Sequence, residues 1–493
     1  MVFKQALIYN VIMNTEKNYL VLDQGSSGSR VFIVNAEGKT LHKKYRELTP
    51  KHLGLNLAEY DGEELLLQQF NLLEEIMQQN PGGKIKSMAV SSQRSTIVLW
   101  DKNTGKTLCP VLTWQDGRGA EYANKVKMSQ EEIHAKTGLY KTPFYSASKI
   151  TWCLNNYPQA KKAAEEGALL IAPVATFVIW HLTGKKVFAV DPTLAQRTLL
   201  FNINTFTWDD DLIAAFNIPK NALPEIKNTV DNYGSYKGIP IKVCVGDQQS
   251  AAIGIGSEKE GDAIINYGTG AFLLVNTDKN LKSIPGLLTS VGPSTKTNPK
   301  NFMLEGPVNA ASAIFQWLNS VGINFDLNDI DDIYQRSKNP VYFLPAFGGI
   351  GAPYWDFETP TVMAGFTTAS KKEDIIAGGV NSLVFMLADI AFYIQKANVK
   401  IDNVKVSGGF AKNHSLLQFQ ADILNTKLTQ TCENETTAMG AVCLMAKEDG
   451  VDVSSWEIFN AHRVINPQIT ALEAMDLYQK WHRFFDWCRS FKK

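Results

Sequence analysis

The most constraining feature of the sequence is an apolar run that leads an acid into a Gly- and Ser-rich turn. Residues 19–22 precede Asp23 and the turn 25–28, and Arg30 then leads into a second apolar run, residues 31–34. This pattern predicts a strand, a tight turn and a returning strand. The backbone of such a turn can cradle an anion, and an acid beside it fits a divalent metal. A surface hairpin with an Asp cap is the alternative interpretation.

The same pattern occurs twice more along the chain. Residues 239–246 form a largely apolar run that ends at Asp247, and residues 263–275 predict a second hairpin around a Gly/Thr turn. Two phosphate-binding hairpins about half the chain apart favour two similar halves that face each other across a cleft. Alternation of strand and helix patterns makes the predicted fold class α/β.

The chain of 493 residues is too long for a single core, so at least two domains are expected. We predict an N-terminal extension over residues 1–18, an N-terminal domain over 19–245 and a C-terminal domain over 246–493. Residues 375–394 are strongly apolar but include Asn381 and Asp389, which predicts a buried helix. Residues 472–491 predict an amphipathic helix that docks on the protein.

The charge and cysteine content exclude several classes of function. Lys plus Arg and Asp plus Glu number 49 each, so no overall field favours nucleic acid or an anionic membrane. The six cysteines show no metal-binding or disulfide spacing, as expected in a reducing compartment. We predict a cytoplasmic protein that neither inserts in a membrane nor binds nucleic acid.

Two phosphate-binding turns and two acids suggest a nucleotide that is held together with a metal. Phosphoryl transfer needs mainly positioning and charge neutralisation, which these groups supply. Asp247 could accept the proton of an attacking hydroxyl. The alternative is that Asp247 caps a helix that begins near Ser250. The Gly408-Gly409 pair suits either close approach to a ligand or an ordinary turn between strand and helix.

Several segments resemble motifs of the FGGY carbohydrate kinases, with the closest resemblance to the glycerol kinases. They are residues 23–30, 246–249, 267–270, 351–356 and 408–409 with Asn413, and the resemblance extends in one order from about residue 19 to about residue 450. It implies two actin-like ATPase (ribonuclease H-like) domains with a deep interdomain cleft. It also implies transfer of a phosphoryl group from ATP, with Mg²⁺, to a hydroxyl of a small polyol or sugar.

The resemblance assigns roles to individual residues. Asp247 is implied as the general base, and Asp23 and Asp247 as the metal site. The implied nucleotide-binding residues are Gly25, Ser26, Ser27, Arg30, Gly268, Thr269, Gln316, Gly409 and Asn413. The implied substrate-binding residues are Arg94, Ser95, Trp114, Phe144, Asp247, Gln248 and Phe272.

The sequence departs from the glycerol kinase pattern at two substrate positions. Ser95 replaces a Glu and Phe144 replaces a Tyr, which removes a carboxylate and a hydroxyl that would hold substrate hydroxyls. Glycerol and a related polyol or a ketose of four or five carbons therefore remain as candidate substrates. An actin-like ATPase module and a catalytically impaired kinase-fold protein are the alternatives, and a homodimer is a further prediction. Lys149 matches a family pattern, but a solvated helix face is its expected place.

Overall fold

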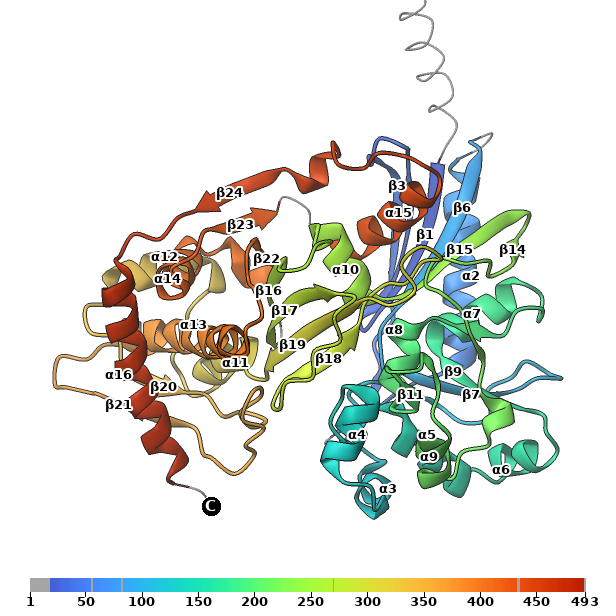
Figure 1. The fold of residues 1–493 in the computed structure, drawn as a ribbon, viewed down its shortest axis with the longest axis horizontal. Helices are drawn as coiled ribbons and strands as arrows, with labels where there is room; N and C mark the ends of the chain where they lie inside the picture. The colour runs from blue at the N-terminus through green and yellow to red at the C-terminus, as the bar shows by residue number, and fades with distance from the viewer. Residues whose placement is uncertain (1–17, 55, 81–82, 269, 432–434, 492–493) are drawn as a thin grey trace, which may run out of the picture. The chain divides into compact units, whose positions relative to one another are not determined.

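The computed structural model describes residues 18–54, 56–80, 83–268, 270–431 and 435–491. The chain divides into two compact units (Figure 1). The first unit contains the described residues up to Gly256, together with Ser290–Asn301 and Glu435–Ile458. The second contains the described residues of Ser257–Thr289, Phe302–Asn434 and Phe459–Lys493. Residues 1–17 of the predicted N-terminal extension lie outside the described residues.

The first unit is built on a six-stranded sheet in the order β14-β15-β6-β1-β2-β3. Its strands are β1 Asn18–Gly25, β2 Gly28–Val34, β3 Thr40–Glu47, β6 Ile85–Ser92, β14 Ser235–Tyr236 and β15 Ile239–Gly246. β1, β2 and β3 are antiparallel neighbours, whereas β6 runs parallel to both β1 and β15. The predicted first hairpin is thus present, with Asp23 opposite Arg30.

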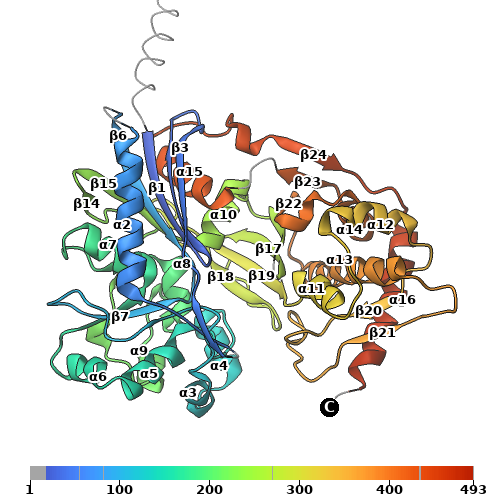
Figure 2. The ribbon, with the colours of Figure 1, turned by 180° about the vertical axis from the view of Figure 1, so that it is seen from behind.

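Helices cover both faces of this sheet (Figures 1 and 2). Helix α2, Gly62–Gln78, packs against β2 and β3. Helix α15, Thr436–Glu448, packs against β1 and β6 and also against α10, Asp247–Ile255. Residues 19–22 of β1 are fully buried, which explains why they form a continuous apolar run rather than an alternating pattern.

A second, five-stranded sheet of the first unit has the order β4-β5-β8-β7-β9. Its strands are β4 Lys51–Gly54, β5 Leu57–Tyr60, β7 Ile97–Asp101, β8 Val111–Leu112 and β9 Leu169–Pro173. Strand β8 ends at Leu112, and the residues that follow it continue as a loop. Short strand pairs join β10 Ala189–Val190 to β13 Glu225–Ile226 and β11 Phe201–Asn202 to β12 Thr207–Trp208.

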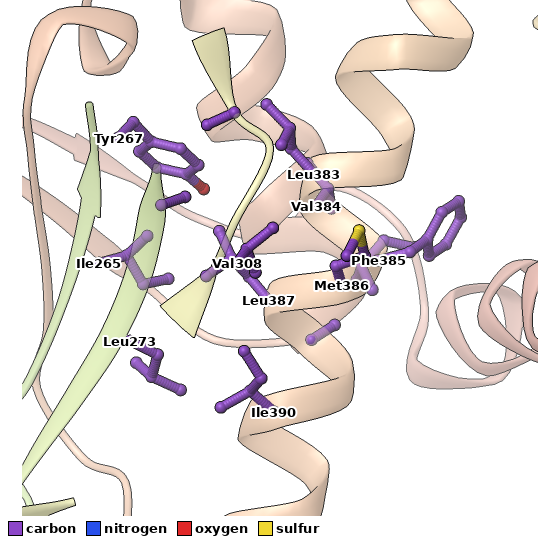
Figure 3. Packing of buried hydrophobic residues seen from close by; sticks show 14 of the residues in the cluster. Ile265, Tyr267, Leu273, Val308, Leu383, Val384, Phe385, Met386, Leu387 and Ile390 are labelled. Atoms are coloured by element: carbon purple, nitrogen blue, oxygen red, sulfur yellow. The ribbon is translucent and has the colours of Figure 1, made fainter. Parts of the chain in front are cut away.

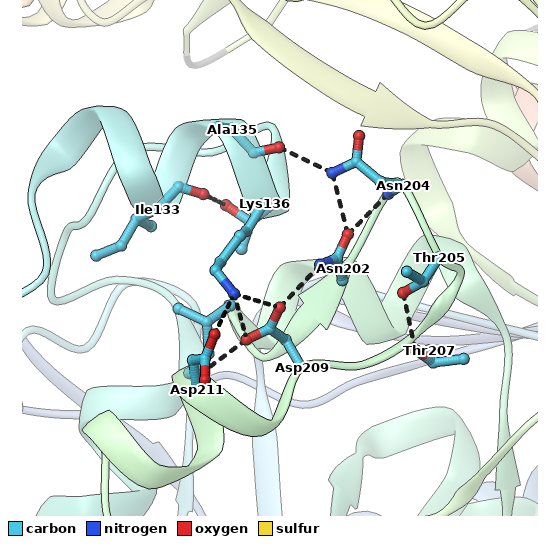
Figure 4. Close-up of polar contacts among 11 residues, drawn as sticks. Ile133, Ala135, Lys136, Asn202, Asn204, Thr205, Thr207, Asp209 and Asp211 are labelled. Carbon is cyan, nitrogen blue, oxygen red and sulfur yellow. Dashed lines mark hydrogen bonds and ion pairs between the residues drawn. The ribbon is translucent and has the colours of Figure 1, made fainter.

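The first unit also contains several short helices. They are α3 Ala120–Lys125, α4 Gln130–Thr137, α5 Ser146–Asn156, α6 Pro158–Glu165, α7 Val174–Leu182, α8 Pro192–Ala195 and α9 Asp210–Ala215, with the 3₁₀ turns Gln196–Thr198 and Lys220–Ala222. Of these, α5, α6 and α7 contact the five-stranded sheet. Lys136 at the end of α4 donates to Asp209, the N-cap of α9, and to Asp211 in its first turn (Figure 4). Asp209 also accepts from Asn202 and from the Leu212 amide, so one carboxylate links three segments.

The second unit is built on a seven-stranded sheet in the order β18-β19-β17-β16-β22-β23-β24. Its strands are β16 Ala263–Tyr267, β17 Ala271–Asp278, β18 Leu288–Val291, β19 Phe302–Val308, β22 Val404–Ser407, β23 Leu428–Thr431 and β24 Ala461–Ile465. A small sheet pairs β20 Tyr342–Leu344 with β21 Val362–Ala364. The second predicted hairpin is present as β16 and β17, which pair antiparallel.

The core of the second unit forms between this sheet and helix α13, Lys372–Lys396 (Figure 3). Leu387 and Ile390 of α13 face Leu273 and Val308 of the sheet. By length and composition α13 is the one described helix that could cross a membrane, but 83% of its apolar 18-residue stretch is buried inside the protein. The prediction of a buried helix over residues 375–394 is therefore confirmed.

Four further helices complete the second unit. They are α11 Ser312–Ser320, α12 Ile330–Arg336, α14 His414–Leu424 and α16 Ala471–Arg489, with 3₁₀ turns at Leu327–Asp329 and Gly409–Lys412. A further 3₁₀ turn, Glu457–Phe459, lies at the point in the sequence where the last segment of the first unit ends and the second unit resumes. The amphipathic helix predicted over residues 472–491 is α16. It docks through Trp481, which is 1% exposed and stacks on Phe385 of α13 at 5.2 Å between ring centroids.

The central strands of the two sheets share one topology. In the first unit an antiparallel trio, β3-β2-β1, continues into the parallel strands β6 and β15. In the second unit the trio β19-β17-β16 continues into β22 and β23 in the same way. The predicted α/β fold with two similar halves is therefore confirmed at the level of strand order.

Candidate active site

Two acids lie at the same edge of the first unit's main sheet. Strand β6 lies between β1 and β15, and both Asp23 and Val245 are in register with its Ser91. Asp247 follows Gly246 at the end of β15. Since the three strands are parallel, their carboxyl ends meet at one edge. The structure therefore brings together the two acids that were predicted to hold the metal.

Asp23 is 4% exposed, so water solvates the charge on its carboxylate poorly. Burial, together with the nearby charge of Asp247, raises the pKa of Asp23 to about 7, although Arg30 acts in the opposite direction. Arg30 Nη1 lies 3.8 Å from Asp23 Oδ2, and Arg30 Nε lies 3.8 Å from Glu435 Oε2. Among the described residues, no hydrogen bond reaches Oδ1 of Asp23, which is buried. This oxygen can bind a cation or accept a hydrogen bond from a ligand.

The backbone of the first hairpin's turn accepts hydrogen bonds from two tyrosine hydroxyls of strands β3 and β5. Tyr60 donates to the Ser26 carbonyl at 2.5 Å, and Tyr45 donates to the Ser27 carbonyl at 3.1 Å. Gly28 has φ of 156°, and a Cβ there would lie 2.4 Å from a backbone oxygen of β3. A side chain at this position would therefore force the hairpin away from β3.

Asp247 is the first residue of α10, and two groups contact its Oδ1. The Gln248 amide donates to it at 2.8 Å, and Arg94 Nε lies 3.8 Å away. The N-cap position of α10 is Gly246, so the alternative prediction that Asp247 caps the helix is wrong. A Cβ on Gly246 would lie 3.1 Å from Arg94 Cγ, so glycine allows the two segments to approach closely.

Three further substrate candidates lie on loops of the first unit. Ser95 is buried and has φ of 62°, in the left-handed region that few non-Gly residues adopt. Trp114 donates from Nε1 to the Ser26 hydroxyl at 2.8 Å, which places a predicted substrate residue beside the predicted phosphate turn. Trp114 and Phe144 are each 41% exposed, so both aromatic faces are available to a ligand.

Lys149 of α5 was not predicted as a site residue, and its expected place on a solvated face is wrong. It is fully buried, and its Nζ donates to the carbonyls of Ser95, Thr113 and Phe144 at 2.7, 2.7 and 2.8 Å. The sequence does indicate that Lys149 is buried, because Ser146–Asn156 contains no other charged residue and so offers no charged, solvated face.

The second unit holds the remaining candidates. Gly268 lies in the turn between β16 and β17, where its amide donates to the Gly270 carbonyl, whereas Thr269 lies outside the described residues. Gly409 follows β22 and is exposed, and a Cβ on it would meet nothing within 4 Å. The other three are Asn413, which is buried before α14, Gln316, which is exposed on α11, and Phe272, which is half-buried on β17.

The sequence matches two family models in succession. Residues 18–254 match the N-terminal domain, and residues 263–448 the C-terminal domain, of the FGGY family of carbohydrate kinases. The chain belongs to this family. The predicted resemblance is therefore confirmed, and so is the prediction that this FGGY kinase has two domains.

Individual relatives of this FGGY kinase match over nearly their full length. A glycerol kinase of Treponema denticola is 34% identical over 494 residues, which span 95% of this chain and 98% of the relative. A glycerol kinase of Shewanella sediminis is 36% identical over 488 residues, with the same coverage. The crystal structure of Plasmodium falciparum glycerol kinase with ADP superposes with a TM-score of 0.91 at 29% identity, covering 97% of this chain and 99% of that one.

Membership in this family makes the protein an enzyme that phosphorylates a small polyol or sugar, with ATP and Mg²⁺. An actin-like ATPase module without kinase activity is therefore not favoured. Among the described residues, no group of three or more His, Cys, Asp or Glu side chains could hold a metal by itself. Mg²⁺ commonly uses one or two carboxylates plus substrate phosphates, which fits Asp23 with its buried Oδ1 and Asp247 nearby.

Proposed function

We propose that this FGGY kinase transfers the γ-phosphoryl group of ATP to a hydroxyl of a small polyol or short sugar, as a glycerol kinase does, with Asp247 as the general base. The observation that carries the proposal is the position of Asp247. Its carboxylate lies at a strand end, 22% exposed, beside Arg94 and at the same sheet edge as Asp23.

The first unit supplies groups for each part of this reaction. As the substrate oxygen bonds to phosphorus, its O–H bond breaks and the proton passes to the Asp247 carboxylate, while ADP leaves. Arg94 and the Gln248 amide orient that carboxylate through Oδ1. Mg²⁺ at Asp23 and Asp247 would neutralise charge on the phosphates. The exposed rings of Trp114 and Phe144 suit the carbon face of a polyol.

The substrate is proposed to be glycerol or a polyol or ketose of four to five carbons. Relatives at 34–36% identity are glycerol kinases, which supports glycerol. Ser95 and Phe144, however, offer fewer hydrogen-bonding groups than the Glu and Tyr of the glycerol kinase pattern. A site that lacks such groups loses discrimination against other substrates, and the smaller Ser95 leaves room for a longer carbon chain.

The test is ADP release with a panel of glycerol, four- and five-carbon polyols and short ketoses. At least one acceptor should raise turnover well above the background ATPase rate. With that acceptor, Asp247→Asn should lower kcat by about 10²–10⁴-fold, because a general base contributes an effect of that size. The dissociation constant of ATP, measured by calorimetry, should change less than about threefold.

Asp210→Asn is the matched control, because Asp210 is an exposed acid of the same unit that pairs with Lys220 outside the site. This variant should retain full turnover. If no acceptor raises turnover above background, the kinase assignment to a polyol or sugar fails. If Asp247→Asn keeps wild-type kcat, the general base must be another group.

We further propose that the enzyme acts in the cytoplasm as a homodimer, without nucleic acid or membrane insertion. The zero net charge and the burial of helix α13 support the absence of those two partners. The cysteines Cys109, Cys153, Cys244, Cys443 and Cys488 are buried and, among the described residues, form no disulfide, which suits a reducing compartment. Sedimentation analysis of the purified enzyme tests the dimer, and a monomer at micromolar concentration would contradict it.

A further inference from the structure

One buried ammonium group joins the three segments that carry the predicted substrate residues. Nζ of Lys149 donates to the carbonyls of Ser95, Thr113 and Phe144 at 2.7–2.8 Å. Ser95 lies in the connection from β6 to β7, Thr113 follows β8, and Phe144 precedes α5. Each bonded residue is itself a substrate candidate or, like Thr113 before Trp114, adjoins one.

The chemistry of this contact requires an ammonium rather than another buried group. An ammonium has three N–H donors, and here each meets a carbonyl oxygen. Among the described residues, no carboxylate forms an ion pair with Lys149. The neighbouring Asp116 pairs with Arg118 at 2.8 Å and also accepts from the Ala58 amide.

The cost of burying this charge argues against a purely stabilising role. Burial lowers the pKa of Lys149 to about 7, although Asp116 raises it. Replacing a buried charged group with a well-packed apolar side chain is often neutral or stabilising, so packing alone does not account for a lysine here. An apolar side chain could not form hydrogen bonds with three carbonyl oxygens and so hold their segments at fixed distances from one another.

The backbone at Ser95 shows why such a restraint matters. Its φ of 62° is unfavourable for a non-Gly residue and persists only when the surroundings hold it. The Ser95 carbonyl accepts from Lys149 Nζ and also from the Ser146 hydroxyl at 3.2 Å. Both donors lie on α5, so this helix determines the path of the segment that presents Arg94.

We propose that Lys149 is a positioning residue for the polyol or sugar, which holds the segments of Ser95, Trp114 and Phe144 at one fixed separation. The inference rests on the proposed function, because the substrate must contact these segments. Lys149 itself lies behind them, bonded only to backbone carbonyls. Its loss should therefore weaken acceptor binding much more than ATP binding.

The test is the steady-state kinetics of Lys149→Ala with the best acceptor of the wild-type enzyme. We expect KM for the acceptor to rise by about 10-fold or more, since misplacing groups by about 1 Å can cost as much as 10²-fold. KM for ATP should stay within about twofold. KM does not depend on how much of the variant is folded, so partial misfolding does not obscure the result.

Chemical rescue separates a need for the ammonium from a need for packing. Added ethylammonium can enter the space left by the side chain of Lys149→Ala and donate to the same carbonyls, and it should lower KM for the acceptor towards the wild-type value. Propanol is similar in size but has one donor and no charge, so it should have little effect.

Lys141→Ala is the matched control. Nζ of Lys141 also bonds two carbonyls, those of Val126 at 3.0 Å and Met128 at 3.4 Å, but neither segment carries a predicted substrate residue. This variant should keep both KM values. An unchanged acceptor KM in Lys149→Ala, or equal rescue by propanol, would overturn the proposal while leaving the proposed function intact. A wild-type enzyme that phosphorylates no acceptor would overturn both.

Discussion

Asp23 is a residue whose charge the protein tolerates poorly in the absence of a cation. Its pKa in the folded state is about 7, mainly because of burial and then because of Asp247, whereas an unfolded Asp titrates near 4. The folded protein therefore binds this proton more tightly than the unfolded chain does. The stability that comes from the protonated group is complete below pH 4 and is lost as the pH rises through 7.

We predict that Asp23→Asn is more stable than the wild type at pH 8, by on the order of 2–4 kcal/mol, because Asn stays neutral at every pH. The difference should shrink towards zero near pH 4–5. Thermal unfolding from pH 4.5 to 8 without divalent cations measures this, with Asp210→Asn as a control that shows no such trend. Equal stability of Asp23→Asn and wild type at pH 8 would contradict the argument.

At the scale of elements, the position of Asp247 depends on how closely α10 packs against α15. A Cβ on Gly440 of α15 would lie 1.7 Å from the Ser250 carbonyl oxygen, and a Cβ on Gly254 of α10 would lie 2.0 Å from the Thr436 carbonyl oxygen. The Ser250 hydroxyl also donates to the Thr437 carbonyl at 2.6 Å. The two backbones are in direct contact, so only glycine fits at the crossing.

Gly440→Ala should therefore force α10 and α15 apart. We expect a loss of about 1–3 kcal/mol in the free energy of unfolding, the usual cost of overpacking, measured by urea denaturation. Since α10 begins at Asp247, kcat should fall as well. Gly54→Ala is the matched control, because its Cβ would meet only Leu57 Cδ1 at 3.4 Å. Wild-type stability in Gly440→Ala would show that the helices can separate without cost.

The elements that the sequence predicts well are those whose signal is local. The hairpins at residues 19–34 and 263–275 follow from apolar runs on both sides of a Gly-rich turn, and α13 follows from its length of apolar sequence. The return of Glu435–Ile458 to the first unit is not visible in this way, because α15 has an ordinary apolar pattern whose partner lies almost 190 residues earlier. Lys149 is missed although its helix has no other charged residue, because two of the three carbonyls that it contacts belong to segments 36 and 54 residues earlier.

The candidate site is predicted only where a motif carries the residue. Asp23, Asp247 and Arg94 occur in recognisable patterns, and the structure brings these three side chains together in the first unit. The left-handed backbone of Ser95 has no such signal, because Ser is not enriched at positive φ. Backbone conformation of this kind depends on tertiary contacts and could not be predicted from the sequence.

At the scale of the whole molecule, the predicted ligand contacts are divided between two separately packed units. All substrate candidates except Phe272 lie in the first unit. The nucleotide candidates are divided between the units: Gly25, Ser26, Ser27 and Arg30 lie in the first, whereas Gly268, Gln316, Gly409 and Asn413 lie in the second, which has a large hydrophobic core of its own. A change that weakens only the core of the second unit should therefore give two unfolding transitions, which ATP and the acceptor raise to different extents.

Trp481→Ala is such a change, because Trp481 is 1% exposed and its removal should cost about 3–5 kcal/mol of the second unit's stability. We predict two calorimetric transitions in this variant, the lower one from the second unit. Because several nucleotide candidates lie in the second unit, its unfolding should release ATP, and ATP with Mg²⁺ at 100 times its dissociation constant should therefore raise the lower transition, by about 2.7 kcal/mol of stability, whereas the acceptor alone should raise mainly the upper one. A single transition that both ligands raise equally would contradict the prediction, because it would show that the two units unfold together.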